Sequence, residues 1–141
     1  MSPRDTGTGE VLEQTIIPAL RRGGYKFKAQ AYIGERPGGR RHKVDYIVAK
    51  EGQKAILISS KYQEVGGTAE QKVPFEVISL IKAIRESKGR FERAHIVLGG
   101  KGWTLREFYT SGGLNPYLKD TDIVKIVSLD QFMALANQGK L

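Results

Sequence analysis

The sequence contains no cysteine and only two histidines, His42 and His95, among its 141 residues. The lack of cysteine excludes disulfide bonds and thiolate metal sites, and it fits a protein of the reducing cytoplasm. Because the two histidines lie far apart in the sequence, they argue against a zinc site. Any metal ion bound by this chain should therefore be held by oxygen ligands.

Long hydrophobic runs are also missing. The longest, such as Ala55 to Ile58 and Ile96 to Leu98, are far shorter than the roughly 20 residues that cross a bilayer, and the N-terminus lacks the apolar core of a signal peptide. We therefore expect a cytoplasmic protein without membrane association. The sequence also lacks an internal repeat, a Walker loop, a serine triad and a dinucleotide-binding glycine pattern, so we expect no nucleotide cofactor.

What the chain does have is sufficient size and a positive charge. Its 141 residues, of which 40% are hydrophobic and 27% charged, suit a soluble domain with a core of its own. We expect a single domain over residues 1–141, with its core at about 8–100 and a peripheral helix–strand–helix segment at about 103–138. The net charge of +8 would attract the phosphate backbone of a nucleic acid.

The most informative stretch runs from Lys43 to Lys61. It reads as two strands joined by a turn, with Asp45 near the start of the first strand and Lys61 at the end of the second. Since side chains alternate along a strand, Ser59, Lys61 and Gln63 share one face. A carboxylate can hold a divalent cation, while a neighbouring lysine orients or deprotonates water and offsets charge on a phosphate. The pattern favours phosphodiester hydrolysis; the alternative is an ordinary amphipathic hairpin.

Positive charge gathers in the glycine- and proline-containing loop immediately before Asp45. Such a run can be a solvated face, but its position beside the candidate site favours contacts with nucleic-acid phosphates. The residues expected to make these contacts are Arg36, Arg40, Arg41 and Lys43.

At these residues the chain resembles the PD-(D/E)XK nuclease superfamily, whose signature is an acid on one strand and (D/E)-x-K on the next. The matching residues are Asp45 and then Ser59, Ser60 and Lys61, with serine where an acid is usual. The resemblance implies a DNA endonuclease dependent on Mg²⁺, with Mn²⁺ able to substitute. It implies that Asp45 and a helix carboxylate hold the metal, that the backbone carbonyl following Ser59 completes the shell, and that Lys61 positions the water.

A first helix is predicted from Thr8 to Arg22, with two glycines as its stop and with Pro18 causing a kink or a division into two pieces. Glu13 lies on the border of its buried stripe, and Glu10 lies further towards solvent. The pattern Gly9, Glu13 and Gly24-Tyr25 is similar to that of archaeal Holliday-junction resolvases within the superfamily. This resemblance implies that Glu13 joins the metal site, with Glu10 as a second choice.

A second helix is predicted from Thr68 to about Lys88, because Thr68 and Gln71 have capping-box spacing. Pro74 makes its start uncertain by one or two turns. Some restriction-enzyme families carry serine at the strand position and take their acid from the following helix. Resemblance to that variant implies Glu70 or Glu76 as the ligand; orientation favours Glu70, which faces the sheet, whereas Glu76 is expected on the flank.

The predicted order of elements is that of the superfamily's common core. We expect an α/β fold with a restriction-endonuclease-like αβββαβ core, in which a central mixed sheet of four to five strands is flanked by helices. Trp103 is expected to plug the core, and Ser128 with Gln131 should cap a last helix. The strands are predicted at residues 25–33, 44–49, 55–62, 94–98 and 122–127.

The stretch from Ser59 to Val77 also resembles small phage and prokaryotic PD-(D/E)XK domain proteins, which have Gln63 in common with this chain. Gln63 is expected to orient water or touch phosphate. A small domain that must cut both strands of DNA is expected to work as a homodimer. The substrate remains open between junctions and duplexes. The alternatives are a non-catalytic nucleic-acid-binding module, suggested by Ser59, and a protein that binds another polyanion.

Overall fold

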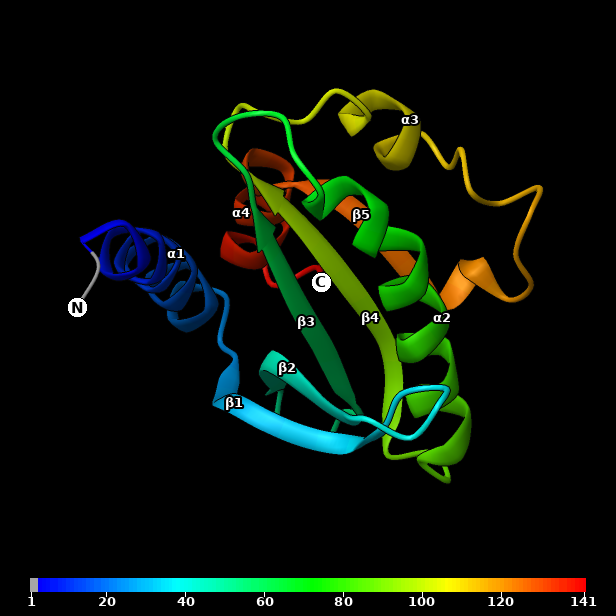
Figure 1. Cartoon of the computed structure of the whole chain (residues 1–141). Coiled ribbons are helices and arrows are strands. Elements are labelled where there is room, and N and C mark those ends of the chain that lie inside the picture. Colours follow the sequence, from blue (N-terminus) through cyan, green and yellow to red (C-terminus); the bar gives the residue numbers. More distant parts are fainter. Residues whose placement is uncertain (1–2) are drawn as a thin grey trace.

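The computed structural model describes the backbone of residues 3–141 and the side chains of residues 13–141. Its centre is a five-stranded mixed sheet with helices on both faces (Figure 1). This arrangement confirms the expected fold class. In chain order the elements are α1 (Pro3–Arg22), β1 (Lys26–Glu35), β2 (Arg41–Ala49), β3 (Ala55–Tyr62), α2 (Ala69–Glu86), β4 (Phe91–Gly99), α3 (Arg106–Thr110), a 3₁₀ turn (Thr121–Ile123), β5 (Val124–Ser128) and α4 (Leu129–Asn137).

The strands lie side by side in the order in which they occur along the chain. The first three pair antiparallel, as successive hairpins do, while β4 runs parallel to β3 and β5 parallel to β4. Helix α2 makes the crossover between β3 and β4, as parallel strands require. The carboxyl ends of β3, β4 and β5 therefore lie together at the same end of the sheet. No helix among the described residues is long and apolar enough to cross a membrane.

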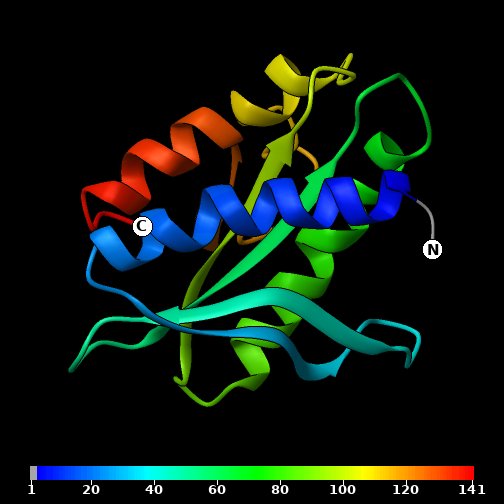
Figure 2. The same ribbon diagram turned by 90° about the vertical axis from the view of Figure 1, so that its left-hand side faces the viewer.

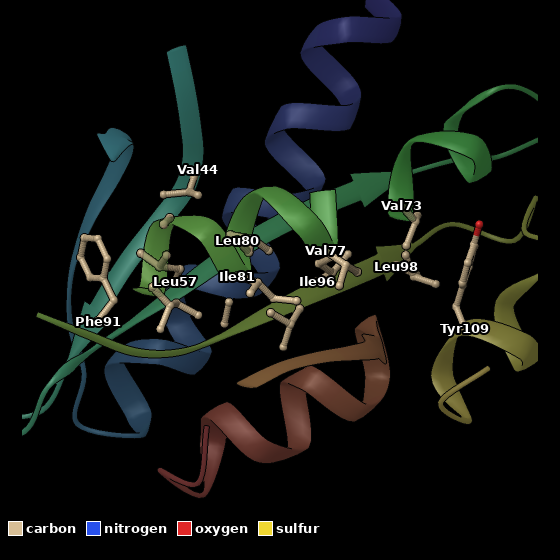
Figure 3. Close-up of a cluster of buried hydrophobic side chains, with 14 of the residues drawn as sticks. Val44, Leu57, Val73, Val77, Leu80, Ile81, Phe91, Ile96, Leu98 and Tyr109 are labelled. Carbon is tan, nitrogen blue, oxygen red and sulfur yellow. The ribbon is translucent and has the colours of Figure 1, made fainter. Parts of the chain in front are cut away.

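Two hydrophobic cores lie on opposite faces of the sheet. On one face α2 and α3 cover residues such as Leu57 and Ile96, as Figure 3 shows. On the other face α1 and α4 lie next to each other across the sheet (Figure 2), over residues such as Ile58 and Val97. Neighbouring residues of one strand thus enter different cores, which is the two-residue alternation of a sheet buried on both sides.

The predicted helix starts, ends and caps were confirmed only in part. Helix α1 is a single element that contains Pro18, which excludes the second of the two expected alternatives, a kink or a division into two pieces. Its end at the two glycines is confirmed, and a β-carbon at Gly23 would clash with the carbonyl oxygen of Ala136. Its start differs from the prediction: α1 begins at Pro3, so Thr8 lies inside the helix and the expected cap at that residue was wrong. Ser128 accepts a hydrogen bond from the amide of Gln131 at 3.2 Å and caps α4 as predicted.

Helix α2 begins close to the predicted residue, but without the predicted capping box. Thr68 stands at its N-terminus without a side-chain capping bond. Pro74 lies inside the helix and cannot donate to the carbonyl of Glu70 four residues earlier. The hydroxyl of Tyr109 in α3 donates to that carbonyl instead, at 2.6 Å. A contact from a distant helix thus satisfies the acceptor that the proline leaves open.

Candidate active site

Strands β2 and β3 separate at the position of Asp45. In the described structure their ladder consists of three residue pairs, the last of them Tyr46 with Ile58. Continuing the same register would place Asp45 opposite Ser59. The Asp45 carboxylate instead accepts a hydrogen bond from the backbone amide of Ser60, at 2.7 Å between Oδ2 and N. A half-buried carboxylate is therefore held where the two strands diverge.

Glu76 of α2 lies beside Ser59 and Lys61. It is only 2% exposed. The Ser59 hydroxyl and the Lys61 ammonium both lie close enough to its carboxylate to lower its pKa. The carboxylate therefore lies just beyond the short side chain of Ser59, on the strand position where the superfamily signature has an acid.

Two further side chains hold the same carboxylate. His42 Nε2 lies 3.2 Å from Glu76 Oε2, and the Arg36 guanidinium donates to Oε1. Burial by itself would raise the pKa of Glu76, but the hydrogen bonds from His42, Arg36 and Ser59 and the charge of Lys61 outweigh it and lower the pKa to about 2. Glu76 is therefore ionised at neutral pH although it is buried.

Glu70 and Gln63, both predicted at the site, contact the loop that follows β4. The Glu70 carboxylate accepts hydrogen bonds from the amide and hydroxyl of Thr104 and from the amide of Leu105. The bond from the Thr104 hydroxyl is the main cause that lowers its pKa, against the effect of burial. Gln63 is buried and donates through Nε2 to the carbonyl of Gly102 at 2.8 Å. Both side chains thus fasten this loop.

The two α2 carboxylates lie on opposite borders of the buried stripe. At about 100° per residue, Glu70 and Glu76 are about 120° apart around the helix axis. One border faces the loop after β4 and the other faces β3 and the hairpin of β1 and β2. Glu76 is thus on the flank of the stripe, as expected, but the β1–β2 hairpin buries it there. Helical spacing identified both borders but could not tell which of them faces Lys61.

Glu13 is exposed on α1 and acts on Tyr46, the residue after Asp45. Burial, followed by the negative charges of Glu13 and Asp45, raises the pKa of Tyr46 to about 12. Both carboxylates therefore influence the same tyrosine hydroxyl, which the sequence did not indicate. The Glu10 side chain lies outside the described residues.

The basic segment is not a uniform phosphate-binding loop. Strand β2 already begins at Arg41, and the Arg41 guanidinium lies over the exposed ring of Tyr32, 3.7 Å from its centroid. Arg40 and Lys43 are exposed. His42, which lies between Arg41 and Lys43 in the sequence, is fully buried in β2 against α2. Every second residue of β2 is buried, beginning with His42. The same two-residue alternation in the sequence could have predicted that His42 points into the protein.

A sequence model of the PD-(D/E)XK nuclease superfamily domain matches residues 4–140. The chain belongs to this superfamily. No curated protein matches the sequence. The match includes β5 and α4, which lie beyond the region where the sequence resemblance was recognised.

Two solved structures resemble this PD-(D/E)XK domain. One is AF1548, a protein of unknown function, with 12% identity, a TM-score of 0.48, and coverage of 86% of this chain and 56% of that one. The other is the small subunit, R.BspD6I2, of the heterodimeric restriction endonuclease R.BspD6I, with 20% identity, a TM-score of 0.45, and coverage of 92% and 73%. The chain thus spans little more than half the length of AF1548. Neither likeness is close enough to say more about this domain.

PD-(D/E)XK nucleases use divalent metal ions, and the carboxylates of this chain fit a site with few protein ligands. Among the described residues, no three histidine, aspartate or glutamate side chains gather into a protein-only metal cage. Mg²⁺ commonly binds through one or two carboxylates and completes its shell with water and substrate phosphate. Asp45 at the strand gap and Glu76 beside Ser59 are two oxygen-donor groups of that kind. The residues therefore offer two carboxylates to a divalent ion that would complete its shell with water and substrate phosphate.

Proposed function

We propose that this PD-(D/E)XK domain is a Mg²⁺-dependent deoxyribonuclease that hydrolyses phosphodiester bonds in DNA. The observation that carries the proposal is the position of Glu76, whose ionised carboxylate contacts Ser59 where the superfamily's strand acid is missing. Without it the site would have one strand carboxylate and would be undercharged for a divalent ion. Mn²⁺ should substitute for Mg²⁺, since both prefer oxygen ligands.

Asp45 and Glu76 would hold the ion, with the backbone carbonyl of Ser60 beside them and Glu13 as a further candidate ligand. When bound, the ion supplies Lewis-acid polarisation of the phosphoryl group. Ser59 orients Glu76 through its hydroxyl. Glu76 takes the role that orientation on the helix had favoured for Glu70, because the Glu70 oxygens accept bonds from Thr104 and Leu105.

Lys61 acts directly on the reacting groups. Its ammonium orients the water whose oxygen forms the new bond to phosphorus as the bond to the leaving oxygen breaks. Negative charge grows on the phosphoryl oxygens during this displacement, and a fixed positive charge beside them lowers its free energy. Gln63 is less suited to orient water, because its amide nitrogen is bound to Gly102.

The exposed basic residues would bind the flanking DNA. Arg40, Arg41 and Lys43 are exposed near the hairpin tip and can contact phosphates without reading sequence. Arg36, by contrast, is bound to Glu76, so its main role is electrostatic within the site. Since one site cuts one strand, we infer that a homodimer with paired sites would be needed to cut a duplex or a junction.

A cleavage panel tests the proposal. Labelled duplex, single-stranded and four-way-junction DNA would be incubated with Mg²⁺, Mn²⁺ or EDTA. Cutting should require metal and should fall by about 100-fold or more in Asp45→Asn, Glu76→Gln and Lys61→Ala proteins, the scale of a single catalytic group. Glu86→Gln is the matched control, because Glu86 is an exposed glutamate at the far end of the same helix. Equal cutting by all variants would refute the proposed roles.

One observation favours a second function, a DNA-binding module without catalysis. Glu76 is already bound by Arg36 and His42, which a metal ion must partly displace. If these two side chains keep the carboxylate, DNA would bind at the basic surface and remain intact with either metal. Metal-independent binding without cleavage in the same panel would decide for this module and against the nuclease.

A further inference from the structure

The β1–β2 hairpin turns over partway along its length. Phe27 and Ala31 of β1 are four residues apart and would share a face in a regular strand. Phe27 nevertheless packs in the core under α1, whereas Ala31 packs in the core under α2. In β2, Tyr46 packs on the α1 side and Val44 on the α2 side. Residues two or four apart in a regular strand point to the same face. Both strands therefore rotate together between these residues, and Figure 1 shows the hairpin passing from below α1 to the side of α2.

Gln30 lies at the turning point. Its φ is 54°, the left-handed region that glycine adopts readily and other residues rarely do. Among the described pairs, Ala29 pairs with Tyr46 and Ala31 with Val44. The register between them sets Gln30 opposite Asp45. A left-handed residue interrupts the extended backbone, so the hairpin has a corner directly across from the candidate catalytic carboxylate.

The corner coincides with two features of the site. On the β3 side, strand pairing ends at Tyr46, and Asp45 accepts the amide hydrogen of Ser60 instead of continuing the ladder. Beyond the corner, the hairpin tip rests on α2. Arg36 and His42 bind Glu76 there, and Lys82 of α2 donates to the backbone carbonyl of Glu35 at 2.9 Å.

We propose that Gln30 is a positioning residue whose left-handed backbone directs both site carboxylates. A straight hairpin would keep Asp45 in the ladder and carry the tip away from α2. The corner frees Asp45 for Ser60 and brings Arg36 and His42 to Glu76. Because the Gln30 side chain is exposed, its backbone conformation carries this role. The inference rests on the proposed function insofar as it treats Asp45 and Glu76 as metal-holding groups.

Substitutions at position 30 test the corner. Gln30→Gly should keep the wild-type Mn²⁺ affinity within about twofold and should raise or preserve the urea midpoint, because glycine accepts a positive φ without strain. Gln30→Val should weaken Mn²⁺ binding about tenfold or more, because a β-branched residue resists this conformation. Mn²⁺ binding would be titrated by electron paramagnetic resonance, and hydrogen exchange of the Ser60 amide would be measured by NMR without metal.

Lys28→Gly is the matched control. Lys28 is exposed on the same strand, pairs with Ile47, and does not have a positive φ. Glycine at position 28 should therefore lower the urea midpoint, as glycine within a strand does, whereas glycine at position 30 should not. Equal losses at both positions would overturn the proposal. So would a Gln30→Val protein with wild-type Mn²⁺ affinity and wild-type Ser60 exchange.

The outcomes separate the corner from the proposed nuclease. If the wild-type protein bound no Mn²⁺, the proposed metal site would be refuted. The urea midpoints of Gln30→Gly and Lys28→Gly and the exchange rate of the Ser60 amide would still decide whether the corner holds Asp45. Should Gln30→Val fail to fold, Gln30→Asn and Gln30→Thr replace it. Asparagine tolerates the left-handed region and should protect Ser60 as wild type does, while the β-branched threonine should not. Equal Ser60 exchange in both would refute the backbone role.

Discussion

The buried charge of Glu76 should make the stability of the protein depend on acid in a specific way. Its pKa falls from the ordinary 4.5 in the unfolded chain to about 2 in the folded protein. A tenfold difference in proton affinity is worth about 1.4 kcal/mol, so this one carboxylate stabilises the fold by about 3 kcal/mol when it is ionised in both states. Since the folded pKa is depressed, that stability is present above pH 4.5 and is lost as the pH falls towards 2.

Glu76→Gln keeps the shape of the side chain but removes the charge, so that Arg36, His42 and Lys61 lose their common partner. At pH 7 it should lower the free energy of unfolding by about 3 kcal/mol, the scale on which broken buried ion pairs act. The loss should shrink steadily below pH 4.5 and nearly vanish at the folded pKa. Urea titrations of wild type and variant at several pH values between 7 and 2.5 would measure this difference.

Glu86→Gln provides the control for that series. Glu86 is on the same helix, but it is exposed and pairs only at the surface with Lys82. Its replacement should cost little at any pH, since such pairs contribute about 0.5 kcal/mol or less. The reasoning would be refuted if Glu76→Gln cost the same at pH 3 as at pH 7. That result would mean that the loss came from packing and not from the ionised carboxylate.

Three further outcomes are expected. Replacing Arg40 and Arg41 together by glutamine should weaken DNA binding regardless of sequence and reduce the slope of log affinity against log salt by about two, and an unchanged slope in binding titrations would show that neither contacts phosphate. Tyr109→Phe should cost about 1–2 kcal/mol in urea unfolding, because the carbonyl of Glu70 loses its hydroxyl donor. Glu70→Gln should loosen the loop around Trp103, the single tryptophan, and shift its fluorescence towards that of exposed indole; an unshifted spectrum would contradict the loop-fastening role.

Much of the fold follows from local sequence patterns. Strand β3 has the predicted bounds, because residues 55–62 combine apolar residues with turn signals on both sides. The expected burial of Trp103 is confirmed, and its indole nitrogen donates to the carbonyl of Gly99 at 2.8 Å. The parallel pairing of β4 with β3 follows from the intervening helix. Each of these features depends on residues close together in the chain or on a general rule of topology.

The assignment of the helix acid could not be made in the same way. Glu70 and Glu76 differ in the partners that reach them from elsewhere, namely the loop at Thr104 for the first and the hairpin tip for the second. Arg36 and Glu76 are 40 residues apart in sequence. Helical periodicity reports only which side of a helix is buried, so it cannot identify the segment that lies against each border.

The serine at position 59 makes the site depend on tertiary structure. An acid at that position would be held by β3 itself, next to Lys61. In the proposed site the second carboxylate comes from α2, and it is bound by the hairpin tip that lies against the same helix. Loosening the tip should therefore disturb Glu76 while leaving the β3–β4 pairing intact. Substitutions at the tip, such as His42→Ala, should accordingly lower metal affinity more strongly than they lower global stability. With an acid on the strand, metal affinity would not depend on the hairpin tip.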